Sequence, residues 1–255
     1  MPQPNNDIPD AVTAALLVIG DEILSGRTKD KNIGYIAEYL TGIGIDLREV
    51  RVVADIEDDI VAALNALRAR YTHVFTTGGI GPTHDDITAD AIARAFGVPI
   101  DVDPRAVALL RERIPEDQLN EARLRMARIP QGAELIENSV SKAPGFSIGN
   151  VHVMAGVPAI MQAMLDALAP RLATGRRMHS RSVLAGLKEG DIGTPLRAVQ
   201  AQFPDVPIGS YPSFDSSTGF TTTVVLRSRD EQRLAAAEAA VAAMLDEVKA
   251  TLGRG

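Results

Sequence analysis

Short apolar runs alternate with amphipathic segments along the first two thirds of the chain. Residues 14–19 and 73–77 are apolar or β-branched runs typical of buried strands, and residues 47–53 also predict a strand. Between them, apolar residues recur at helical spacing in 33–40 and 57–70. Because strands that alternate with helices of this length form right-handed βαβ units, the pattern predicts an α/β fold with a mainly parallel sheet.

Further elements extend the same domain. Residues 151–154 predict a strand, and residues 159–168 predict the helix that follows it. Residues 104–128 contain arginines mixed evenly with acids, so we interpret them as a solvated helical segment that is broken near Pro115. Together these elements predict one α/β domain at 11–170.

The regular alternation ends after a linker that we predict at 171–177. The order then becomes strand, helix, strand, strand and helix, which predicts a small two-layer α+β domain at 178–255. Residues 1–10 are polar and contain prolines, so we expect a disordered tail there. The predicted elements of the second domain are 179–185, 194–202, 206–211, 220–227 and 231–252.

Composition narrows the class of protein. A chain of 255 residues that is 45% hydrophobic can bury one or two cores. Its net charge of −7, without a long basic cluster, argues against a nucleic-acid partner, and the absence of cysteine excludes disulfides and thiolate sites. There is no signal-peptide pattern and no apolar run of ~20 residues, so we expect a cytoplasmic protein with no membrane partner.

The most informative motif is a glycine-rich loop between the strand at 73–77 and a helix. It runs Gly78-Gly79-Ile80-Gly81-Pro82-Thr83-His84-Asp85-Asp86-Ile87-Thr88. Glycine lets a ligand approach the main chain closely, and we expect Thr88 to cap the helix. Free N–H groups at a helix N-terminus favour an anion, whereas Asp85 and Asp86 would repel one. This combination favours a phosphorylated ligand that is bridged by a divalent cation.

Two familiar classes of glycine loop do not fit this motif. A dinucleotide fingerprint would need a glycine where His84 stands. A P-loop would end in Gly-Lys-Ser or Gly-Lys-Thr, and no lysine occurs between Lys31 and Lys142. A plain strand-to-helix turn with a solvated acidic tip stays open. His84, beside Asp85, is an open candidate for acid–base or metal chemistry.

Three other segments carry candidate binding groups. Gly20-Asp21-Glu22 follows the first strand, and Gly156-Val157-Pro158 follows a later one. In an open parallel sheet, the loops at the carboxyl ends of the strands gather at one edge, where ligands bind. The segment 138–146 is rich in hydrogen-bonding groups, and its Lys142 could serve a phosphate. A helix start or an ordinary polar loop is the alternative for each segment.

These motifs, in this order, resemble the molybdopterin-binding domain superfamily. The form Gly-Pro-Thr-x-Asp-Asp most resembles the N-terminal region of the competence/damage-inducible protein A (CinA) family. The resemblance covers about residues 14–168, and residues 182–248 resemble the second domain of that family. It rests on Gly20 to Gly26 with Asn32, on Thr77 to Thr88, on Asn138 with Ala143-Pro144-Gly145, and on Gly156 to Pro158.

The resemblance implies a three-layer α/β sandwich with a ligand that crosses the loop at Gly78. In the molybdenum-cofactor branch, it implies that the acid matching Asp86 works in adenylylation of molybdopterin or in metal insertion. In the CinA branch, it implies metal-dependent hydrolysis of ADP-ribose, and related domains fused to FAD synthases cleave FAD. Many CinA proteins continue into a nicotinamide-nucleotide amidase domain, but this sequence stops at Gly255, so we do not expect amidase activity.

The predicted function is therefore a metal-dependent pyrophosphatase that acts on ADP-ribose or on a related adenine dinucleotide such as FAD. Two alternatives stay open: a non-catalytic module that binds molybdopterin or a nucleotide, and adenylyl transfer to molybdopterin in molybdenum cofactor biosynthesis. The predicted cofactor is a divalent metal ion, with molybdopterin as a candidate ligand.

The predicted site combines acids with loop residues. Asp85 and Asp86 are the predicted catalytic residues, and together with Asp21 they are the predicted metal ligands. The predicted ligand-binding residues are Gly20, Asp21, Glu22, Asn32, Thr77, Gly78, Gly79, Gly81, Pro82, Thr83, Thr88, Asn138, Lys142, Gly145, Gly156 and Pro158.

The second domain is poor in candidate catalytic groups, so we expect it to contribute to a homo-oligomer rather than to chemistry. Its last helix shows an alanine-rich stripe, which suits either burial against the domain's own sheet or close packing of another helix. The stripe consists of Ala236, Ala239, Ala240 and Ala243.

Overall fold

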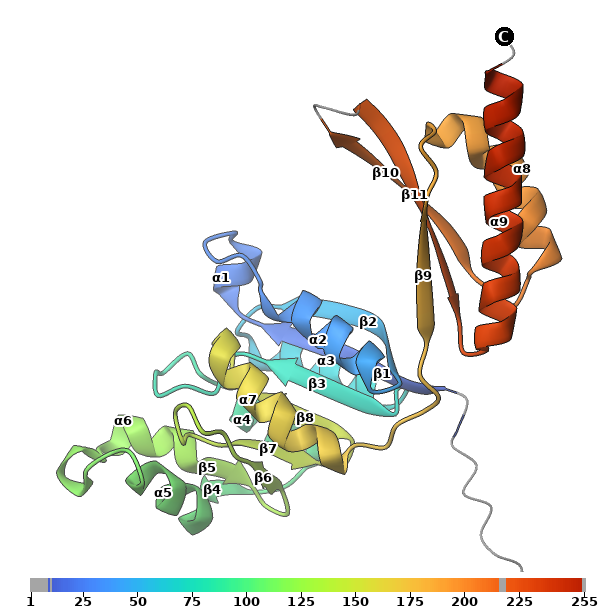
Figure 1. Cartoon of the computed structure of the whole chain (residues 1–255). Coiled ribbons are helices and arrows are strands. Elements are labelled where there is room, and N and C mark those ends of the chain that lie inside the picture. The colour runs from blue at the N-terminus through green and yellow to red at the C-terminus, as the bar shows by residue number, and fades with distance from the viewer. Residues whose placement is uncertain (1–8, 10, 216–218, 254–255) are drawn as a thin grey trace, which may run out of the picture. The chain divides into compact units, whose positions relative to one another are not determined.

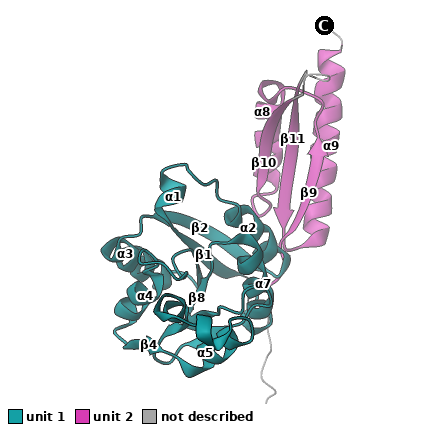
Figure 2. Ribbon diagram, turned by 90° about the vertical axis from the view of Figure 1, so that its left-hand side faces the viewer, with its two compact units in different colours: residues 1–175 teal, residues 176–255 magenta. Residues whose placement is uncertain are grey.

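The computed structural model of the chain describes residue 9, residues 11–215 and residues 219–253. It forms two compact units, Met1–Gly175 and Arg176–Gly255, which Figure 2 shows in different colours. The division falls inside the segment that the sequence predicts as a linker. The tail predicted at 1–10 lies, apart from Pro9, outside the described residues. No helix in the described part of the chain is long and apolar enough to span a lipid bilayer.

A six-stranded, mainly parallel sheet forms the centre of unit 1 (Figure 1). The predicted strands are confirmed to within two residues. Two further strands, β6 (Glu134–Ile136) and β7 (Gly145–Ile148), were not predicted, because strands of three and four residues show no clear period. Along the sheet the order is β2 (Ile45–Val53), β1 (Val12–Ile19), β3 (His73–Thr77), β8 (Val151–Met154), β7 (Gly145–Ile148) and β6 (Glu134–Ile136); the first four are parallel, and β7 is antiparallel to both of its neighbours.

Helices cover both faces of this sheet, so the predicted three-layer sandwich is confirmed. Successive side chains of β1 point to opposite faces, with Leu17 in one core and Leu16 in the other, both fully buried. This explains why the strand is a continuous apolar run. One face carries α3 (Glu57–Arg68), α4 (Thr88–Phe96) and α5 (Pro104–Arg111), and the other carries α2 (Asn32–Gly42) and α7 (Pro158–Leu168).

The predicted helical segment at 104–128, broken near Pro115, is confirmed in outline, although beyond α5 it consists of short pieces. Pro115 does interrupt the helical pattern, but Asn120 then caps a separate short helix by accepting a bond from Arg123 N. The segment breaks into η1 (Glu116–Gln118), α6 (Glu121–Leu124) and η2 (Arg125–Ala127), and it ends in β5 (Arg128–Pro130), which pairs antiparallel with β4 (Ile100–Val102).

Unit 2 has the predicted order of strand, helix, strand, strand and helix, which confirms the small α+β domain. Both helices bury apolar side chains in one core with the antiparallel sheet β10-β11-β9. In the last helix the buried face contains Leu234, Ala237 and Val241, whereas Ala236 and Ala239 of the predicted stripe are exposed. The elements are β9 (His179–Leu184), α8 (Glu189–Gln202), β10 (Ile208–Asp215), β11 (Gly219–Ser228) and α9 (Glu231–Leu252).

Candidate functional site

Three strand-end loops converge on Gly78. A Cβ at Gly78 would lie 2.1 Å from the carbonyl oxygen of Ile19, and a Cβ at Gly156 would lie 3.3 Å from Gly78 Cα. Gly78 also has a φ of 102°, which a residue with a side chain rarely adopts. The loops after β1, β3 and β8 therefore meet at the carboxyl edge, as the sequence predicts. One prediction is corrected: the N–H of Gly78 donates to Met154 O at 3.3 Å, so it is not a free donor for an anion.

Thr88 fixes the loop from behind and does not cap the helix as predicted. The helix α4 begins at Thr88 itself, and Ile87 occupies the N-cap position without a side-chain bond. The buried Thr88 hydroxyl donates to Gly78 O at 3.0 Å, and its N–H donates to Gly79 O at 3.0 Å. A Cβ at Gly79, whose φ is 65°, would lie 2.2 Å from that hydroxyl. The first turn of α4 thus holds the glycines in a fixed conformation.

The adjacent acids Asp85 and Asp86 have different surroundings. Thr83 N and Thr83 Oγ1 donate to Asp86 Oδ2 at 2.8 and 2.6 Å, which fixes that carboxylate. It lies over Gly81, where a Cβ would be 2.7 Å from Asp86 Oδ2. Asp85 is exposed, like Pro82 and Thr83 before it, and its pKa is lowered by the nearby Thr83 hydroxyl and by its own backbone N–H. Asp86 is therefore the positioned acid and Asp85 the solvent-facing one.

Asp55, which the sequence analysis did not single out, joins the acids of the loop after β1. Its Oδ2 accepts a bond from Asp21 N, at the start of the short helix α1 (Asp21–Leu24), at 2.9 Å. Burial raises the pKa of Asp55, and the negative charges of Asp21, Glu22 and Asp85 raise it further. Acids from three loops therefore share one negatively charged region. The available signal was position, because Asp55 follows β2 at the same sheet edge.

The Gly20 turn brings Glu22 back toward the edge of the sheet. Gly20 N donates to Val53 O at 3.1 Å, and a Cβ at Gly20 would lie 2.6 Å from the Glu22 carboxylate. The absence of a side chain at Gly20 thus leaves room for the Glu22 carboxylate in this conformation.

The acidic region does not form a complete metal cage. In the described parts of the chain, no group of three or more His, Asp or Glu side chains is placed to hold a metal ion, so the predicted set of Asp21, Asp85 and Asp86 is not such a group. Magnesium is usually held by one or two carboxylates together with substrate phosphates.

A cavity of about 220 Å³, here called the strand-end pocket, lies beside Gly78. Two buried oxygens of lining residues, Asn32 Oδ1 and Thr77 Oγ1, have no hydrogen-bond partner in the described structure, although Asn32 and Thr77 are only 4% and 1% exposed. Unpaired buried polar atoms are unfavourable, so both favour a polar ligand group here. The lining is Val18, Ile19, Glu22, Ile23, Thr28, Lys29, Asp30, Lys31, Asn32, Thr77, Gly78, Gly156 and Pro158.

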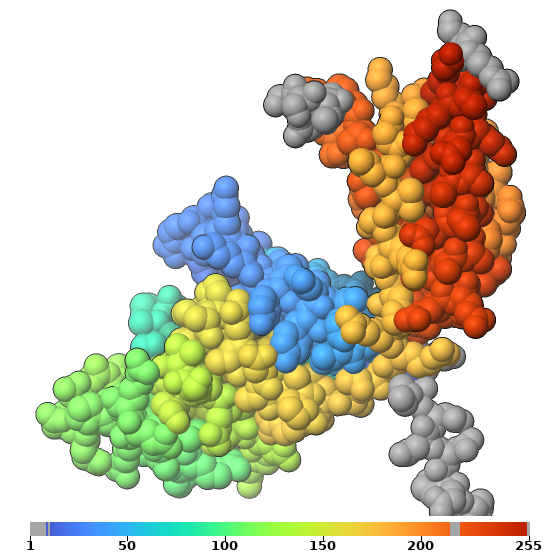
Figure 3. Space-filling model, viewed as in Figure 1, coloured from blue at the N-terminus to red at the C-terminus, as the bar shows by residue number. Residues whose placement is uncertain are grey.

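Loop and helix starts hold this pocket together. Asn32 Nδ2 donates to Gly156 O at 2.8 Å, which joins the start of α2 to the loop after β8. Pro158 is the first residue of α7, one residue before the predicted start of that helix. In the space-filling view, the segment after β1 (blue) forms a raised lobe beside the start of α7 (yellow) (Figure 3). Lys29 and Lys31 of this segment were not predicted, although they stand in a charged run directly after the Gly20–Gly26 motif.

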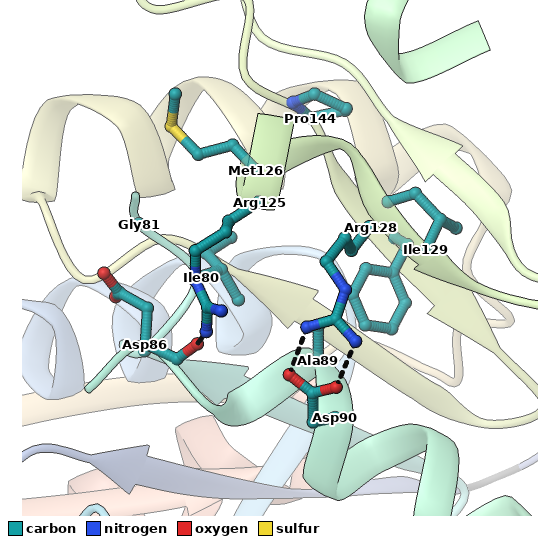
Figure 4. Close-up of a pocket in the computed structure, with 12 residues that line it drawn as sticks. Ile80, Gly81, Asp86, Ala89, Asp90, Arg125, Met126, Arg128, Ile129 and Pro144 are labelled. Carbon is teal, nitrogen blue, oxygen red and sulfur yellow. Dashed lines mark hydrogen bonds and ion pairs between the residues drawn. The ribbon is translucent and has the colours of Figure 1, made fainter. Parts of the chain in front are cut away.

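A second, much smaller cavity of about 10 Å³, the Asp86 pocket, lies beside Gly81 of the glycine loop (Figure 4). Arg125 Nη2 donates to the main-chain oxygen of Asp86 at 3.2 Å, and Arg128 binds both Asp90 oxygens at 2.8 and 2.6 Å. The interpretation of this segment as a solvated surface is therefore wrong for both arginines. The lining is Gly79, Ile80, Gly81, Asp86, Ala89, Asp90, Arg125, Met126, Arg128, Ile129, Pro144 and Phe146.

Several predicted ligand-binding residues line neither pocket, and three of them, Asn138, Lys142 and Gly145, contact other parts of the fold. Lys142 Nζ forms an ion pair with a carboxylate oxygen of Glu112 at 2.5 Å. A Cβ at Gly145 would lie 2.2 Å from Val153 O, so this glycine permits the close approach of β7 and β8. The side chain of Asn138 is bonded to its own loop, accepting from Val140 N and Ser141 N and donating to Ala143 O.

Comparison with known families divides the chain in the same way as the structure. Residues 15–174 match the family described as "Probable molybdopterin binding domain". Residues 177–251 match the family described as "FAD synthase, middle domain".

Individual relatives match large parts of the chain. A CinA-like protein of Desulfosudis oleivorans is 34% identical over 209 residues, 77% of this chain and 51% of that protein. A probable FAD synthase of Caenorhabditis elegans is 29% identical over 255 residues, 90% of this chain and 49% of that protein. This chain thus spans about half the length of either relative. The crystal structure of CinA from Thermoplasma acidophilum, whose function is given as unknown, is 35% identical, with a TM-score of 0.60 over 63% of this chain and 98% of that one.

Proposed function

This chain belongs to the molybdopterin-binding domain family and is CinA-like, and on that premise we propose that it hydrolyses the pyrophosphate of an adenine dinucleotide such as ADP-ribose or FAD. Its second unit is related to FAD synthases, which handle an adenine dinucleotide. The proposal joins this relationship to the chemistry of the loops around Gly78.

The observation that carries the proposal is the strand-end pocket with its two unpaired oxygens. At about 220 Å³ it is smaller than the pockets of roughly 300 Å³ or more that enclose whole ligands, so it suits one ring system of a larger molecule. Asn32 Oδ1 accepts an N–H group, and the amino group of adenine is such a donor. The rest of the substrate would then extend past Gly78 toward the acids.

The pyrophosphate is proposed to lie along the glycine loop. Lys29 and Lys31 supply positive charge from the pocket wall, and the main chain at Gly79 and Gly81 allows close approach. Asp21 and Asp85 would hold a divalent cation together with the phosphates. Such a cation would neutralise the phosphates and make water a better nucleophile.

Asp86 is the proposed general base. Thr83 holds Asp86 Oδ2, whereas the described residues make no bond to Oδ1, which can accept a proton. Water attacks phosphorus, the bond from that phosphorus to the bridging oxygen breaks, and the proton passes to Asp86. With ADP-ribose the products are AMP and ribose 5-phosphate.

The test is release of AMP from ADP-ribose and FAD, with and without added Mg²⁺ or Mn²⁺. Asp86→Ala should lower kcat/KM at least about 100-fold, since a general base typically contributes a factor of that size. Its Tm should stay within a few degrees of the parent. Asp117→Ala, which removes an exposed acid of η1, is the matched control and should retain activity. Undiminished hydrolysis by Asp86→Ala would overturn the proposal.

A second candidate is a binding module or an adenylyl transferase for molybdopterin. The observation that favours it is the match of residues 15–174 to the family described as "Probable molybdopterin binding domain". A pterin also carries an amino group that suits Asn32 Oδ1. Mass spectrometry of small molecules released from the purified protein, and AMP formation from ATP with and without molybdopterin, distinguish the two. A co-purified pterin, or AMP formation only with molybdopterin, supports this second candidate.

A further inference from the structure

Arg125 makes an unusual contact with the glycine loop. Its Nη2 donates to the main-chain oxygen of Asp86 at 3.2 Å, while its Nε is buried without a hydrogen-bond partner in the described structure. Among the described residues it forms no ion pair with a carboxylate. A guanidinium that lacks an acid and has a shielded N–H is costly to keep. Its described polar partner is the peptide of the proposed base.

The neighbouring Arg128 shows what an ordinary structural arginine does in the same segment. It binds Asp90 through two short bonds, in the first turn of α4. Asp86 and Asp90 lie on either side of the start of α4, so the two arginines hold the loop and the helix separately (Figure 4). Loss of Arg128 would disturb the helix, whereas loss of Arg125 would release the peptide of Asp86.

Arg125 does not have room to bind a phosphate directly in this arrangement. The Asp86 pocket measures about 10 Å³, which is space for about one water molecule. Contact through the Asp86 peptide is therefore the route by which Arg125 can influence the reaction.

We propose that Arg125 is a positioning residue, which orients the Asp86 carboxylate by holding the Asp86 main-chain oxygen. This rests on the proposed function for its effect on rate, but the geometry itself can be tested without turnover. The segment 104–128 then has a role in the site, because it contains Arg125, which sets the orientation of the Asp86 carboxylate.

The kinetic test compares Arg125→Gln, Arg125→Lys and Arg123→Gln in the full-length chain. Arg125→Gln should lower kcat about 10- to 100-fold, the loss typical of removing an outer partner of an active-site group, with KM nearly unchanged. Arg125→Lys keeps a cationic donor and should recover part of the loss. Arg123 donates to Gln118 O and not to the loop, so Arg123→Gln is the matched control. Equal kcat for the Arg125→Gln and Arg123→Gln variants would overturn the proposal.

Hydrogen exchange gives a second measurement that does not depend on activity. The amides of Thr83, Asp86 and Thr88 are each bonded within the loop, and in Arg125→Gln they should exchange at least about fivefold faster, the factor for one hydrogen bond. The amides of β3 should keep the parent rate. If the parent chain has no hydrolase activity but the loop amides respond in this way, the proposed function fails and the positioning role stands. Unchanged loop exchange would overturn the positioning role.

Discussion

The two ends of strands β3 and β8 use their polar groups in opposite ways. Near the start of these strands, His73 Nδ1 and His152 Nε2 lie 3.1 Å apart, His73 Nε2 contacts Ala173 O at 3.0 Å, and Ser147 Oγ lies 2.9 Å from His152 Nδ1. At the other end, Thr77 Oγ1 has no partner in the described structure.

The bonds of His73 and His152, here called the histidine end, determine which ring nitrogen of each histidine carries the proton. Ala173 O can only accept, so His73 Nε2 donates, and His73 Nδ1 must then accept from His152 Nε2. His152 Nδ1 is left to accept from the Ser147 hydroxyl. Burial lowers the pKa of both histidines, that of His152 to about 3, so both stay neutral and the chain of bonds persists at neutral pH. A closed network of this kind supports the fold, whereas unpaired oxygens at the strand ends favour a ligand.

The largest effect should come from filling the point where the three loops meet. In Gly78→Ala the added methyl would lie 2.1 Å from Ile19 O and would sit on a backbone with positive φ. We expect a loss of about 3 kcal/mol in the free energy of unfolding and loss of detectable ligand binding. Gly26→Ala is the control, because its φ is also positive but a Cβ there meets no atom within 4 Å. Normal binding of ADP-ribose by Gly78→Ala would mean that the ligand does not use this junction.

Acidic pH should lower the free energy of unfolding through the two buried histidines. A histidine with a lowered pKa is neutral in the fold but takes up a proton in the unfolded chain below its ordinary value of 6.5. Its full contribution to stability is therefore present above pH 6.5 and declines by about 1.4 kcal/mol per pH unit as the pH falls toward the folded value. Urea unfolding at pH 7.0, 6.0 and 5.0 measures this slope.

The control for this slope is His152→Phe, which removes one of the two groups. This variant should be less stable at pH 7.0, because His73 Nδ1 and the Ser147 hydroxyl lose their partner, but its stability should depend less on pH. Affinity for ADP-ribose at pH 7.0 should be unchanged, since His152 lies away from the carboxyl edge. The same pH slope in variant and parent would show that other groups titrate instead.

How well the sequence predicts each feature depends on how local its cause is. The run around Leu16 and Leu17 predicts a strand because burial on both faces needs apolar residues alone. The need for glycine at Gly78 and Gly81 was recognisable too, but its reasons were not. One avoids the Ile19 carbonyl and the other makes room for Asp86, and both contacts depend on how the chain folds.

Contacts between distant segments also limit how well the sequence predicts the residues of the site. Arg125 lies 39 residues from Asp86 along the chain, so its contact leaves no local pattern. Asn138 and Lys142 stand in a motif typical of the family, yet their side chains bond within the loop or to Glu112. A motif indicates which segments matter, but it does not separate the residues that touch a ligand from those that shape the loop.

A smaller effect should come from removing one unpaired hydroxyl. Thr77→Val keeps the shape of the side chain and should leave the free energy of unfolding unchanged or slightly higher, because a buried unpaired oxygen is lost. If that hydroxyl bonds the ligand, Kd should rise about fivefold. Thr76→Val is a close control: its hydroxyl is also buried and unpaired in the described structure, but Thr76 does not line the strand-end pocket. Equal Kd values for the two variants would remove Thr77 from the site.

The smallest effect on either strand end should come from removing unit 2. A chain of residues 1–177 retains the strand-end pocket, the Asp86 pocket and Ala173, so we expect its Kd for ADP-ribose to stay within about twofold of the parent. We do expect light scattering to show a different oligomeric state, because a homo-oligomer formed through unit 2 remains our prediction. The exposed side chains of Leu184 and Tyr211 on its sheet agree with a contact there. If the truncated chain keeps the oligomeric state of the parent but loses affinity for ADP-ribose, unit 2 contributes to the ligand site. The division of roles between the units would then be wrong.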